Sequence, residues 1–273
     1  MRFAVLAAAF TLSATLAACT SIRVQETQFI RPDAPGTPVA ERLSMAGVSD
    51  LHVERPDGAT LRGVLSEQPG ARTTLLYFGG NTFHLDRHLR ELLPVLAACG
   101  TNVAVFDYRG YGRSSGQPTV ANMQEDALAM FDAVNARLPG RVIVHGQSLG
   151  SFMAAHVAAA RPVLATVLET TASSAADLVR AQVPWYAWPF VRIEIAPSLR
   201  QVDNRAAAAQ FQAATLVIAA GQDKMTPPAL GRQVYAAIPR ADKQLLMLDD
   251  AGHNDALRAK GAAAAYCGFV RGR

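Results

Sequence analysis

The sequence predicts an α/β protein built on a mostly parallel central sheet with helices on both faces. Short apolar runs of strand length alternate with longer segments of helical spacing along most of the chain, which is the pattern of such a sheet. Residues 146–150, between a strand run and a helix, read Gly-Gln-Ser-Leu-Gly. With 273 residues, of which 50% are hydrophobic and 18% charged, the chain can bury a large core in one globular domain.

The first predicted elements form a hairpin, because residues 48–54 and 59–66 have β patterns and flank the turn residues 56–58, Pro-Asp-Gly. The later strands are expected to be buried and parallel, since each is a short apolar run. They cover residues 73–78, 102–106, 142–145, 163–168, 215–219 and 243–248. Helical spacing covers residues 85–99, 119–138, 148–160, 227–237 and 255–270. Pro139 and Gly140 end the second of these helices, and Pro162 follows the third.

Residues 1–18 have the parts of a secretory signal peptide, namely a positive start, an apolar run and a small-residue end. Residues 16–19, Leu-Ala-Ala-Cys, resemble the lipobox of bacterial lipoproteins. The resemblance implies cleavage before Cys19, acylation of that residue and a lipid anchor in the cell envelope. Because Thr20 rather than Asp follows, it also implies the outer membrane of a Gram-negative bacterium. An ordinary secretory signal with a chance cysteine is the alternative.

Residues 19–40 are expected to form a semi-extended tether between the lipid and the folded domain, which then covers residues 41–273. Pro32, Pro35, Gly36 and Pro38 interrupt a stretch that has no apolar periodicity. Such a composition is typical of a spacer rather than of a packed element.

Ser148 is the candidate nucleophile. It lies at the centre of the G-x-S-x-G sequence, between the strand of residues 142–145 and the following helix. That context indicates a nucleophile elbow, in which a tight turn exposes the serine hydroxyl at the edge of the sheet. The glycines allow the strand and the helix to approach closely, and the N-terminus of the helix favours developing negative charge. The alternative is a glycine-rich turn without a catalytic role.

A serine hydroxyl needs an adjacent base at neutral pH, and His253 is the best candidate. It follows the last strand, in the loop before the terminal helix, whereas the other histidines lie in the hairpin, within a strand or on helices. For the acid, Asp223 follows the strand of residues 215–219 and falls between Ser148 and His253 along the chain. Enzymes with this elbow use the same order. Glu169, directly after another strand, remains the rival.

The backbone N–H groups of Leu149 and Asn81 are the candidate donors to an oxyanion. Leu149 is the residue after the nucleophile, which commonly supplies one donor. Asn81 lies in the loop after the strand of residues 73–78, where Gly79 and Gly80 allow the backbone to approach a substrate. Thr82 is the alternative second donor, and a simple turn is the alternative for the loop.

Together these motifs resemble the α/β-hydrolase-fold serine hydrolases related to serine aminopeptidases and monoacylglycerol lipases, in particular the Bem46-like lipases and esterases. The resemblance covers roughly residues 45–270 and includes residues 107–114, Asp-Tyr-Arg-Gly-Tyr-Gly-Arg-Ser. It implies the α/β-hydrolase fold with a small helical cap, and it assigns Asp107 and Arg109 to bracing of the loops behind the site. The family usually has His-Gly-Asn where residues 79–81 of this chain read Gly-Gly-Asn, so its oxyanion loop departs from the pattern.

In this fold the segment before the strand of residues 215–219 forms the cap, here approximately residues 170–212. It contains both tryptophans of the chain. Trp185, Tyr186 and Trp188 are expected to line an acyl or aromatic substrate pocket. Two alternatives remain open: contact with a membrane surface, where Trp and Tyr are favoured, and packing of the cap against the body.

The fold also bears on the two cysteines that follow Cys19. In the fold that the resemblance implies, the helices near Cys99 and Cys267 cover the same face of the sheet and run the same way, so their ends are expected to meet. An exported protein sits in an oxidising compartment, and the pair is therefore a candidate disulfide. The alternative is two small buried apolar residues.

The expected function is hydrolysis of carboxylic esters through the serine, histidine and aspartate candidates and an acyl-enzyme. An aminopeptidase or amidase with the same residues is the alternative, and it would need a carboxylate to bind a free amine. Glu169, Asp177 and Glu194 are the candidates for that carboxylate. A lipid-anchored binding protein without catalysis is the third reading.

Composition and motifs limit the other partners. The net charge is +4, but the basic residues are scattered without a run, so a nucleic-acid partner is not predicted. The sequence has no metal-ligand motif and no phosphate-binding glycine pattern, and no metal or cofactor is expected. The expected partners are an ester or amide substrate and, through Cys19, a membrane.

Overall fold

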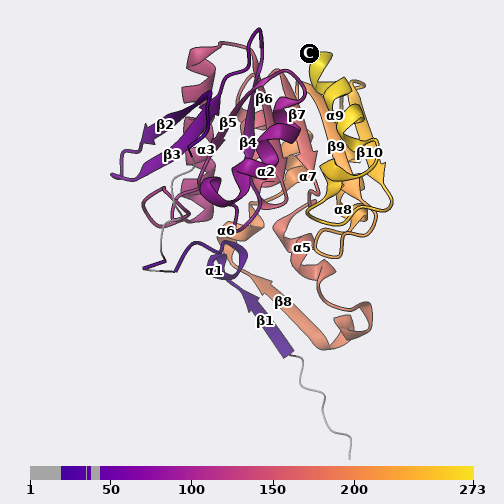
Figure 1. Ribbon diagram of the computed structural model, residues 1–273. Coiled ribbons are helices and arrows are strands. Elements are labelled where there is room, and N and C mark those ends of the chain that lie inside the picture. The colour runs from indigo at the N-terminus through magenta and orange to yellow at the C-terminus, as the bar shows by residue number, and fades with distance from the viewer. Residues whose placement is uncertain (1–19, 35, 38–43) are drawn as a thin grey trace, which may run out of the picture.

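The computed structural model describes residues 20–34, 36–37 and 44–273 (Figure 1). Within them the central sheet has eight strands in the order β10-β9-β7-β6-β4-β5-β3-β2. Their bounds are Val48–Glu54 for β2, Thr60–Ser66 for β3, Thr74–Phe78 for β4, Asn102–Phe106 for β5, Val142–Gln147 for β6, Ala165–Glu169 for β7, Ala214–Ala220 for β9 and Lys243–Leu248 for β10. Strands β10 to β5 pair in parallel, and β3 is antiparallel to both β5 and β2. The predicted mostly parallel sheet is confirmed.

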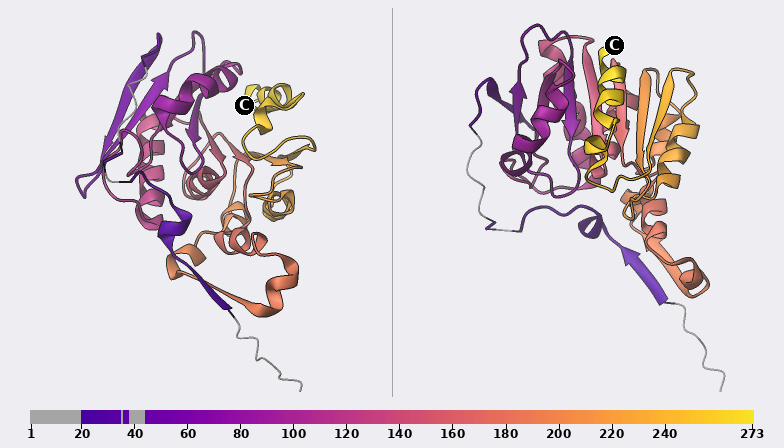
Figure 2. Two further views of the ribbon diagram at one scale, coloured as in Figure 1. Left: turned by 60° about the horizontal axis from the view of Figure 1, so that its bottom comes forward. Right: turned by 45° about the vertical axis from the view of Figure 1, so that its right-hand side comes forward.

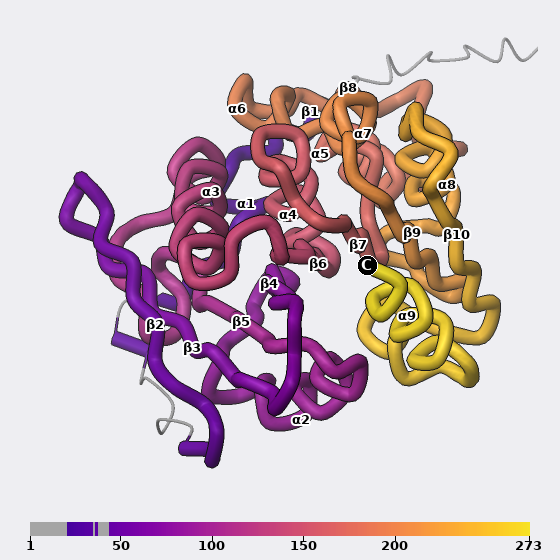
Figure 3. The backbone as a smooth tube through the Cα atoms, turned by 90° about the horizontal axis from the view of Figure 1, so that it is seen from above, coloured from indigo at the N-terminus to yellow at the C-terminus, as the bar shows by residue number. Residues whose placement is uncertain are grey.

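Helices cover both faces of this sheet, as Figure 3 shows from above. One face carries α2 and α9, and the other carries α3, α4 and α8. Their bounds are Leu85–Ala97 for α2, Val120–Arg137 for α3, Leu149–Ala160 for α4, Pro228–Ala237 for α8 and Ala262–Arg271 for α9. The predicted last helix is divided into a short turn, η2 (Ala256–Arg258), and α9, because Gly261 adopts a left-handed conformation (φ 79°) between them.

The core follows from the alternation of side chains along buried strands. All residues of β4 are buried. Leu76 and Phe78 belong to the apolar cluster beneath α3 and α4, whereas Leu75 and Tyr77 belong to the cluster beneath α2 and α9. A continuous apolar strand therefore contributes side chains to the core on both faces of the sheet. The site then forms from residues that follow the strands, at the carboxyl edge of the sheet.

Residues 170–212, the predicted cap, contain one strand that the sequence pattern did not reveal. They form α5 (Ala175–Ala181), η1 (Trp185–Phe190), β8 (Val191–Ile195), α6 (Pro197–Arg200) and α7 (Asn204–Ala208). Strand β8 has no place in the central sheet, and instead pairs in parallel with β1 (Thr20–Val24) to make a two-stranded arm. The arm projects from the body of the molecule (Figures 1 and 2).

The prediction of a tether over residues 19–40 is wrong for the part that the structure describes. After β1, the helix α1 (Glu26–Phe29) leads to Ile30, which is 2% exposed, and the Phe29 ring lies 5.8 Å from the ring of Phe152. These apolar side chains find partners far along the chain, which local periodicity does not reveal. The predicted signal peptide, Cys19 and the tether residues 35 and 38–40 lie outside the described residues.

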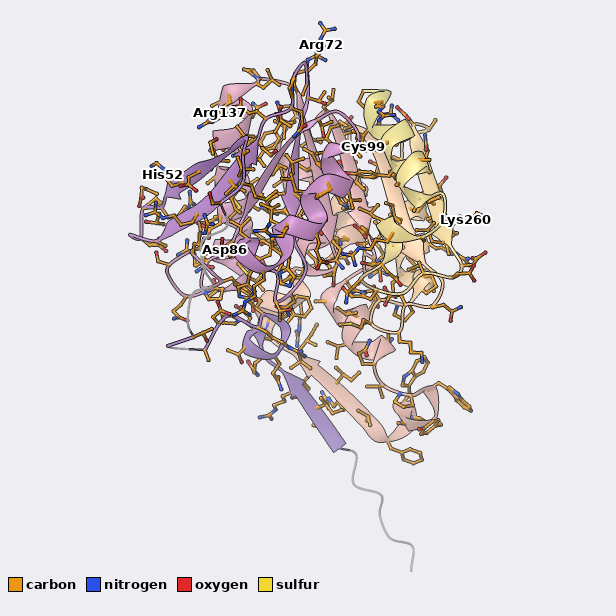
Figure 4. The ribbon with its side chains drawn as sticks, in the orientation of Figure 1. His52, Arg72, Asp86, Cys99, Arg137 and Lys260 are labelled. Atoms are coloured by element: carbon orange, nitrogen blue, oxygen red, sulfur yellow. A yellow bond between two sulfur atoms is a disulfide. The ribbon has the colours of Figure 1, made fainter. Side chains whose placement is uncertain are left out.

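Cys99 and Cys267 form a disulfide, with their Cα atoms 4.8 Å apart. Cys99 follows α2 and Cys267 lies on α9, and Figure 4 labels Cys99 beside the latter helix. The predicted pairing is confirmed, and it joins the two helices of one face over a separation of 168 residues. Across residues 20–34, 36–37 and 44–273, no helix combines the length and apolarity needed to cross a bilayer.

Candidate active site

Ser148 lies in a strained turn between β6 and α4. Its backbone has φ 53° and ψ −116°, a conformation that residues other than glycine rarely adopt. The flanking glycines are required by close approach rather than by their own dihedral angles. A Cβ on Gly146 would lie 2.2 Å from the carbonyl oxygen of Gly150, and one on Gly150 would lie 2.0 Å from that of Phe78. The turn therefore holds the serine at the carboxyl edge of the sheet, as the motif predicts.

The loop after β10 brings the imidazole of His253 to this serine. His253 Nε2 lies 2.8 Å from Ser148 Oγ, and His253 Nδ1 lies 2.7 Å from Asp223 Oδ2. The Asp223 side chain is fully buried, and that of His253 is 10% exposed. The three residues come from three separate strand ends, and the structure places the predicted serine and aspartate each within hydrogen-bond distance of the predicted histidine.

Asp223 is held as an ionised acceptor. Its Oδ1 accepts hydrogen bonds from the backbone N–H groups of Met225 and Thr226, both at 2.8 Å, and the Thr226 hydroxyl donates to Oδ2. Burial alone would raise the pKa of Asp223, but the hydrogen bonds from His253 and Thr226 outweigh it and leave that pKa below its usual value of 3.8. The carboxylate can therefore fix the orientation of the imidazole at neutral pH.

Glu169, the rival acid, has another partner. Its Oε2 lies 3.0 Å from Nε2 of His145, whose Nδ1 lies 3.1 Å from the Tyr266 hydroxyl. His145 and Tyr266 are completely buried, and the ring of Tyr77 meets the His145 imidazole edge to face at 5.0 Å. This buried group behind the elbow was not predicted from the sequence. Its signal was present, because His145 on β6 and Glu169 on β7 fall on the same face of neighbouring strands, one pleat apart.

The loop after β4 lies against the elbow. A Cβ on Gly80 would lie 2.3 Å from Gln147 Oε1 and 3.5 Å from the Cβ of Ser148, so the loop backbone passes close to the nucleophile. Leu149 is the first residue of α4, where the N–H groups of a helix have no carbonyl partner in a preceding turn. Asn81 thus lines the pocket at Ser148, and Leu149 directly follows this serine.

The side chain of Asn81 anchors this loop to the N-terminal segment. Its Oδ1 accepts hydrogen bonds from the Arg31 N–H at 3.2 Å and the Tyr111 hydroxyl at 2.9 Å. Its Nδ2 donates to the Phe29 carbonyl at 2.9 Å. With the amide engaged on both sides, the backbone N–H is the group of Asn81 that remains for a substrate. The alternative donor, Thr82, has a φ of 68°.

Asp33 continues this attachment. Its carboxylate lies 2.8 Å from His84 Nε2 and accepts a hydrogen bond from the Gly112 N–H at 2.9 Å. Burial opposes ionisation of Asp33, but these two hydrogen bonds leave its pKa below the usual value. We call residues 29–33 the N-terminal latch, because they bind the loop of residues 79–84 through Asn81 and His84.

Asp107 and Arg109 brace the loops behind the site, as the resemblance implies. Asp107 is fully buried and accepts hydrogen bonds from the backbone N–H groups of Leu85 at 2.8 Å and Arg113 at 2.9 Å. Burial raises the pKa of Asp107 to about 6 despite these donors. Arg109 pairs with the buried carboxylate of Asp126.

A pocket of about 420 Å³ opens at Ser148 and His253. Its apolar wall comes from Tyr77, Phe83, Leu92, Val95, Met225 and Leu257. The prediction that Trp185, Tyr186 and Trp188 line the pocket is wrong, since all three are more than half exposed on η1 and none borders it. The pocket wall comes from α2, β4 and η2 instead, which the aromatic content of the cap did not indicate.

In the described part of the chain no cluster of His, Cys, Asp and Glu side chains could hold a metal ion.

Comparisons with known proteins support an α/β-hydrolase fold. A family model described as serine aminopeptidase, S33, matches residues 70–201. An uncharacterized protein of Mycobacterium tuberculosis is 32% identical over 230 residues, covering 82% of this chain and 78% of that protein. The alpha/beta hydrolase domain-containing protein WAV2 of Arabidopsis thaliana is 26% identical over 247 residues, covering 84% of this chain and 80% of its own.

Among solved structures, the Pyrococcus furiosus esterase Pf2001 superposes with a TM-score of 0.67 at 17% identity, covering 82% of this chain and 91% of that one. This similarity shows the fold, and the fold class predicted from the sequence is confirmed. The sequence relatives, one of them 32% identical over 82% of the chain, and the matching family model show that the chain belongs to the α/β-hydrolase family of enzymes.

Proposed function

We propose that this protein is a serine hydrolase that cleaves carboxylic esters through an acyl-enzyme. One observation carries the proposal: a single imidazole, that of His253, lies within hydrogen-bond distance of both the Ser148 hydroxyl and the Asp223 carboxylate. An isolated hydroxyl is a poor nucleophile, and this arrangement supplies the base together with the group that orients it.

The proposed reaction has two halves. Ser148 Oγ attacks the ester carbonyl while His253 Nε2 takes its proton, and Asp223 stabilises the resulting imidazolium. The backbone N–H groups of Asn81 and Leu149 bind the oxyanion. The tetrahedral species collapses, and the leaving alcohol takes the proton from His253. Water then attacks the acyl-enzyme, giving its proton to the same imidazole, and the carboxylic acid leaves as Ser148 regains its proton.

Labelling with a fluorophosphonate probe tests the nucleophile directly. The wild-type protein is expected to be labelled and to hydrolyse p-nitrophenyl esters, and Ser148→Ala is expected to abolish both. Ser49→Ala is the matched control, because Ser49 is an exposed serine on β2, far along the sheet from the site. Labelling that persists in Ser148→Ala would contradict the assignment.

An aminopeptidase remains the second candidate, because one carboxylate borders the pocket. Asp177 bonds to Ser173 and Ser174, and Glu194 pairs with Arg23 on the projecting arm. Glu169, by contrast, lines the pocket beside Ser148 and could receive a substrate amine. Hydrolysis of aminoacyl p-nitroanilides faster than of short p-nitrophenyl esters, with a loss confined to the anilides in Glu169→Gln, would favour this candidate over the esterase.

We extend the proposal to the subgroup of hydrolases to which the protein belongs and to its place in the cell. The residues 107–114 support a place among the Bem46-like hydrolases. The Leu-Ala-Ala-Cys sequence before Thr20 supports a lipid anchor on Cys19 in the outer membrane. Metabolic labelling with an alkynyl palmitate is expected to mark the protein and not Cys19→Ala, and equal labelling of the two would contradict the anchor.

A further inference from the structure

Four exposed aromatic rings stand together on η1. Trp185, Tyr186, Trp188 and Phe190 are 76%, 64%, 53% and 56% exposed. In the described part of the chain, the other exposed large apolar side chains are Ile22, at 39%, and Met225, at 55%. We call these four residues the aromatic tip. A soluble monomer rarely leaves such a cluster facing water without a use for it.

The rings of the aromatic tip are partly ordered. The indole N–H of Trp188 donates to the Val183 carbonyl at 3.0 Å, and the rings of Trp185 and Tyr186 meet edge to face at 6.0 Å. The following strand, β8, is held by its pairing with β1. The aromatic tip is therefore a presented surface on a supported arm, not the pocket lining that the sequence predicts.

The start of the described chain lies at this same place. Thr20 pairs with Val191, which directly follows Phe190 of the aromatic tip. Cys19, the proposed site of the lipid, directly precedes Thr20 in the sequence. A lipid carried by Cys19 would therefore leave the molecule beside the four rings. The arm that carries both features projects away from the body (Figure 2).

The side chains next to the aromatic tip suit a phospholipid surface. Trp and Tyr favour the interface between lipid and water, where an apolar ring and a polar N–H or O–H are both satisfied. Arg23 on β1 and Arg192 on β8 have side chains that are 76% exposed, and both lie near the carboxylate of Glu194. Two cations with one anion leave the arm with a positive excess, which attracts anionic lipid headgroups.

We infer that the aromatic tip docks this protein onto the interface of a phospholipid bilayer, with the four rings among the headgroups and the first acyl carbons. The inference does not depend on catalysis.

Docking by this surface also orients the domain. Gln182 Nε2 donates to the carbonyl of Met225, a pocket residue, at 2.8 Å. Trp185 follows Gln182 by three residues and so lies within about 11 Å of it between Cα atoms. The pocket then lies close to the membrane.

The tryptophan content makes a direct test possible. The chain has two tryptophans and both belong to the aromatic tip, so intrinsic tryptophan fluorescence reports on this surface alone. The full chain is mixed with vesicles of phosphatidylethanolamine and phosphatidylglycerol, and the floated fraction is studied. Iodide in the water is expected to quench the emission several-fold less than without vesicles, while lipids brominated near the headgroups are expected to quench it.

Three outcomes would overturn the inference. Unchanged iodide quenching in the floated protein would show that the indoles stay in water although the anchor holds. Failure of the protein to float with vesicles would show that the surface has no affinity for lipid. Protection from iodide that rises with protein concentration in the absence of vesicles would identify a second copy of the chain as the occupant.

Variants separate the aromatic tip from the anchor and from general surface charge. In a Cys19→Ala background, Tyr186→Ser with Phe190→Ser keeps both tryptophans and is expected to lower vesicle binding on the order of tenfold. The control is Arg72→Ser with Arg137→Ser, which removes two cations at the end of the molecule away from the arm (Figure 4). An equal loss in the control would assign the binding to net charge and overturn the inference.

Discussion

The elbow at the carboxyl edge of the sheet and the N-terminal latch both contribute to one site, but they are specified in different ways. The elbow is set by neighbours in sequence, since Gly146, Ser148 and Gly150 make the turn that the motif announces. The latch is set by residues far from it along the chain. Asn81 reaches Phe29 over 52 positions, and His84 reaches Asp33 over 51. The local turn of the elbow leaves a motif that can be read from the sequence, whereas the distant contacts of the latch leave no comparable pattern.

The largest expected effect is a loss of activity at the carboxyl edge of the sheet, and it tests which carboxylate orients His253. Asp223→Asn keeps the shape of the side chain but allows the wrong imidazole tautomer, so kcat/KM for a p-nitrophenyl ester should fall about 10⁴-fold. Glu169→Gln, on the neighbouring strand, is the control and should cost much less, because Glu169 bonds to His145. Comparable losses of kcat/KM in the two variants would contradict the assignment of Asp223 alone as the acid that orients His253.

The next effect concerns the glycines of the elbow. Gly150→Ala would place a Cβ 2.0 Å from the carbonyl oxygen of Phe78, a backbone atom that cannot move aside. We expect a loss of about 3 kcal/mol or more in the free energy of unfolding, measured by urea titration. Gly268→Ala on α9 is the control, since a Cβ there meets no atom within 4 Å, and it should stabilise the helix by about 0.5–1 kcal/mol. Equal urea midpoints for Gly150→Ala and Gly268→Ala would contradict the steric clash at residue 150.

Much of the fold and of the site follows from the sequence because their signals are local. The six later strands, the elbow serine and the histidine after β10 all fall where apolar runs and turns place them. The arm does not, because β8 gains its strand conformation from β1, a partner more than 160 residues away, and not from its own pattern. The prediction that the aromatic rings of η1 line the pocket was wrong for a related reason. The composition of a loop does not reveal the direction in which the loop projects from the body.

The latch gives the third effect, a smaller one. Asp33→Ala removes the partner of His84 and of the Gly112 N–H, so the loop that carries the Asn81 donor loses its support. We expect kcat to fall roughly tenfold, the equivalent of one weakened oxyanion hydrogen bond, with KM little changed. Asp33→Asn keeps an acceptor for Gly112 and should recover part of the loss. Asp242→Ala, at an exposed ion pair with Arg273, is the control. A change in KM alone would place the latch in substrate binding instead.

The smallest effect is the dependence of stability on acid. The folded-state pKa of Asp33 lies below its usual value of 3.8, so its ionised form stabilises the fold. That contribution is complete above the unfolded pKa and disappears as the pH falls through the folded pKa, because the protonated carboxyl loses its attraction to His84 and Arg87. In urea titrations at pH 7 and pH 3, the wild-type protein should therefore lose more stability than Asp33→Asn. If the two lose the same amount, the latch is held by its backbone hydrogen bonds, and its carboxylate matters no more than any exposed one.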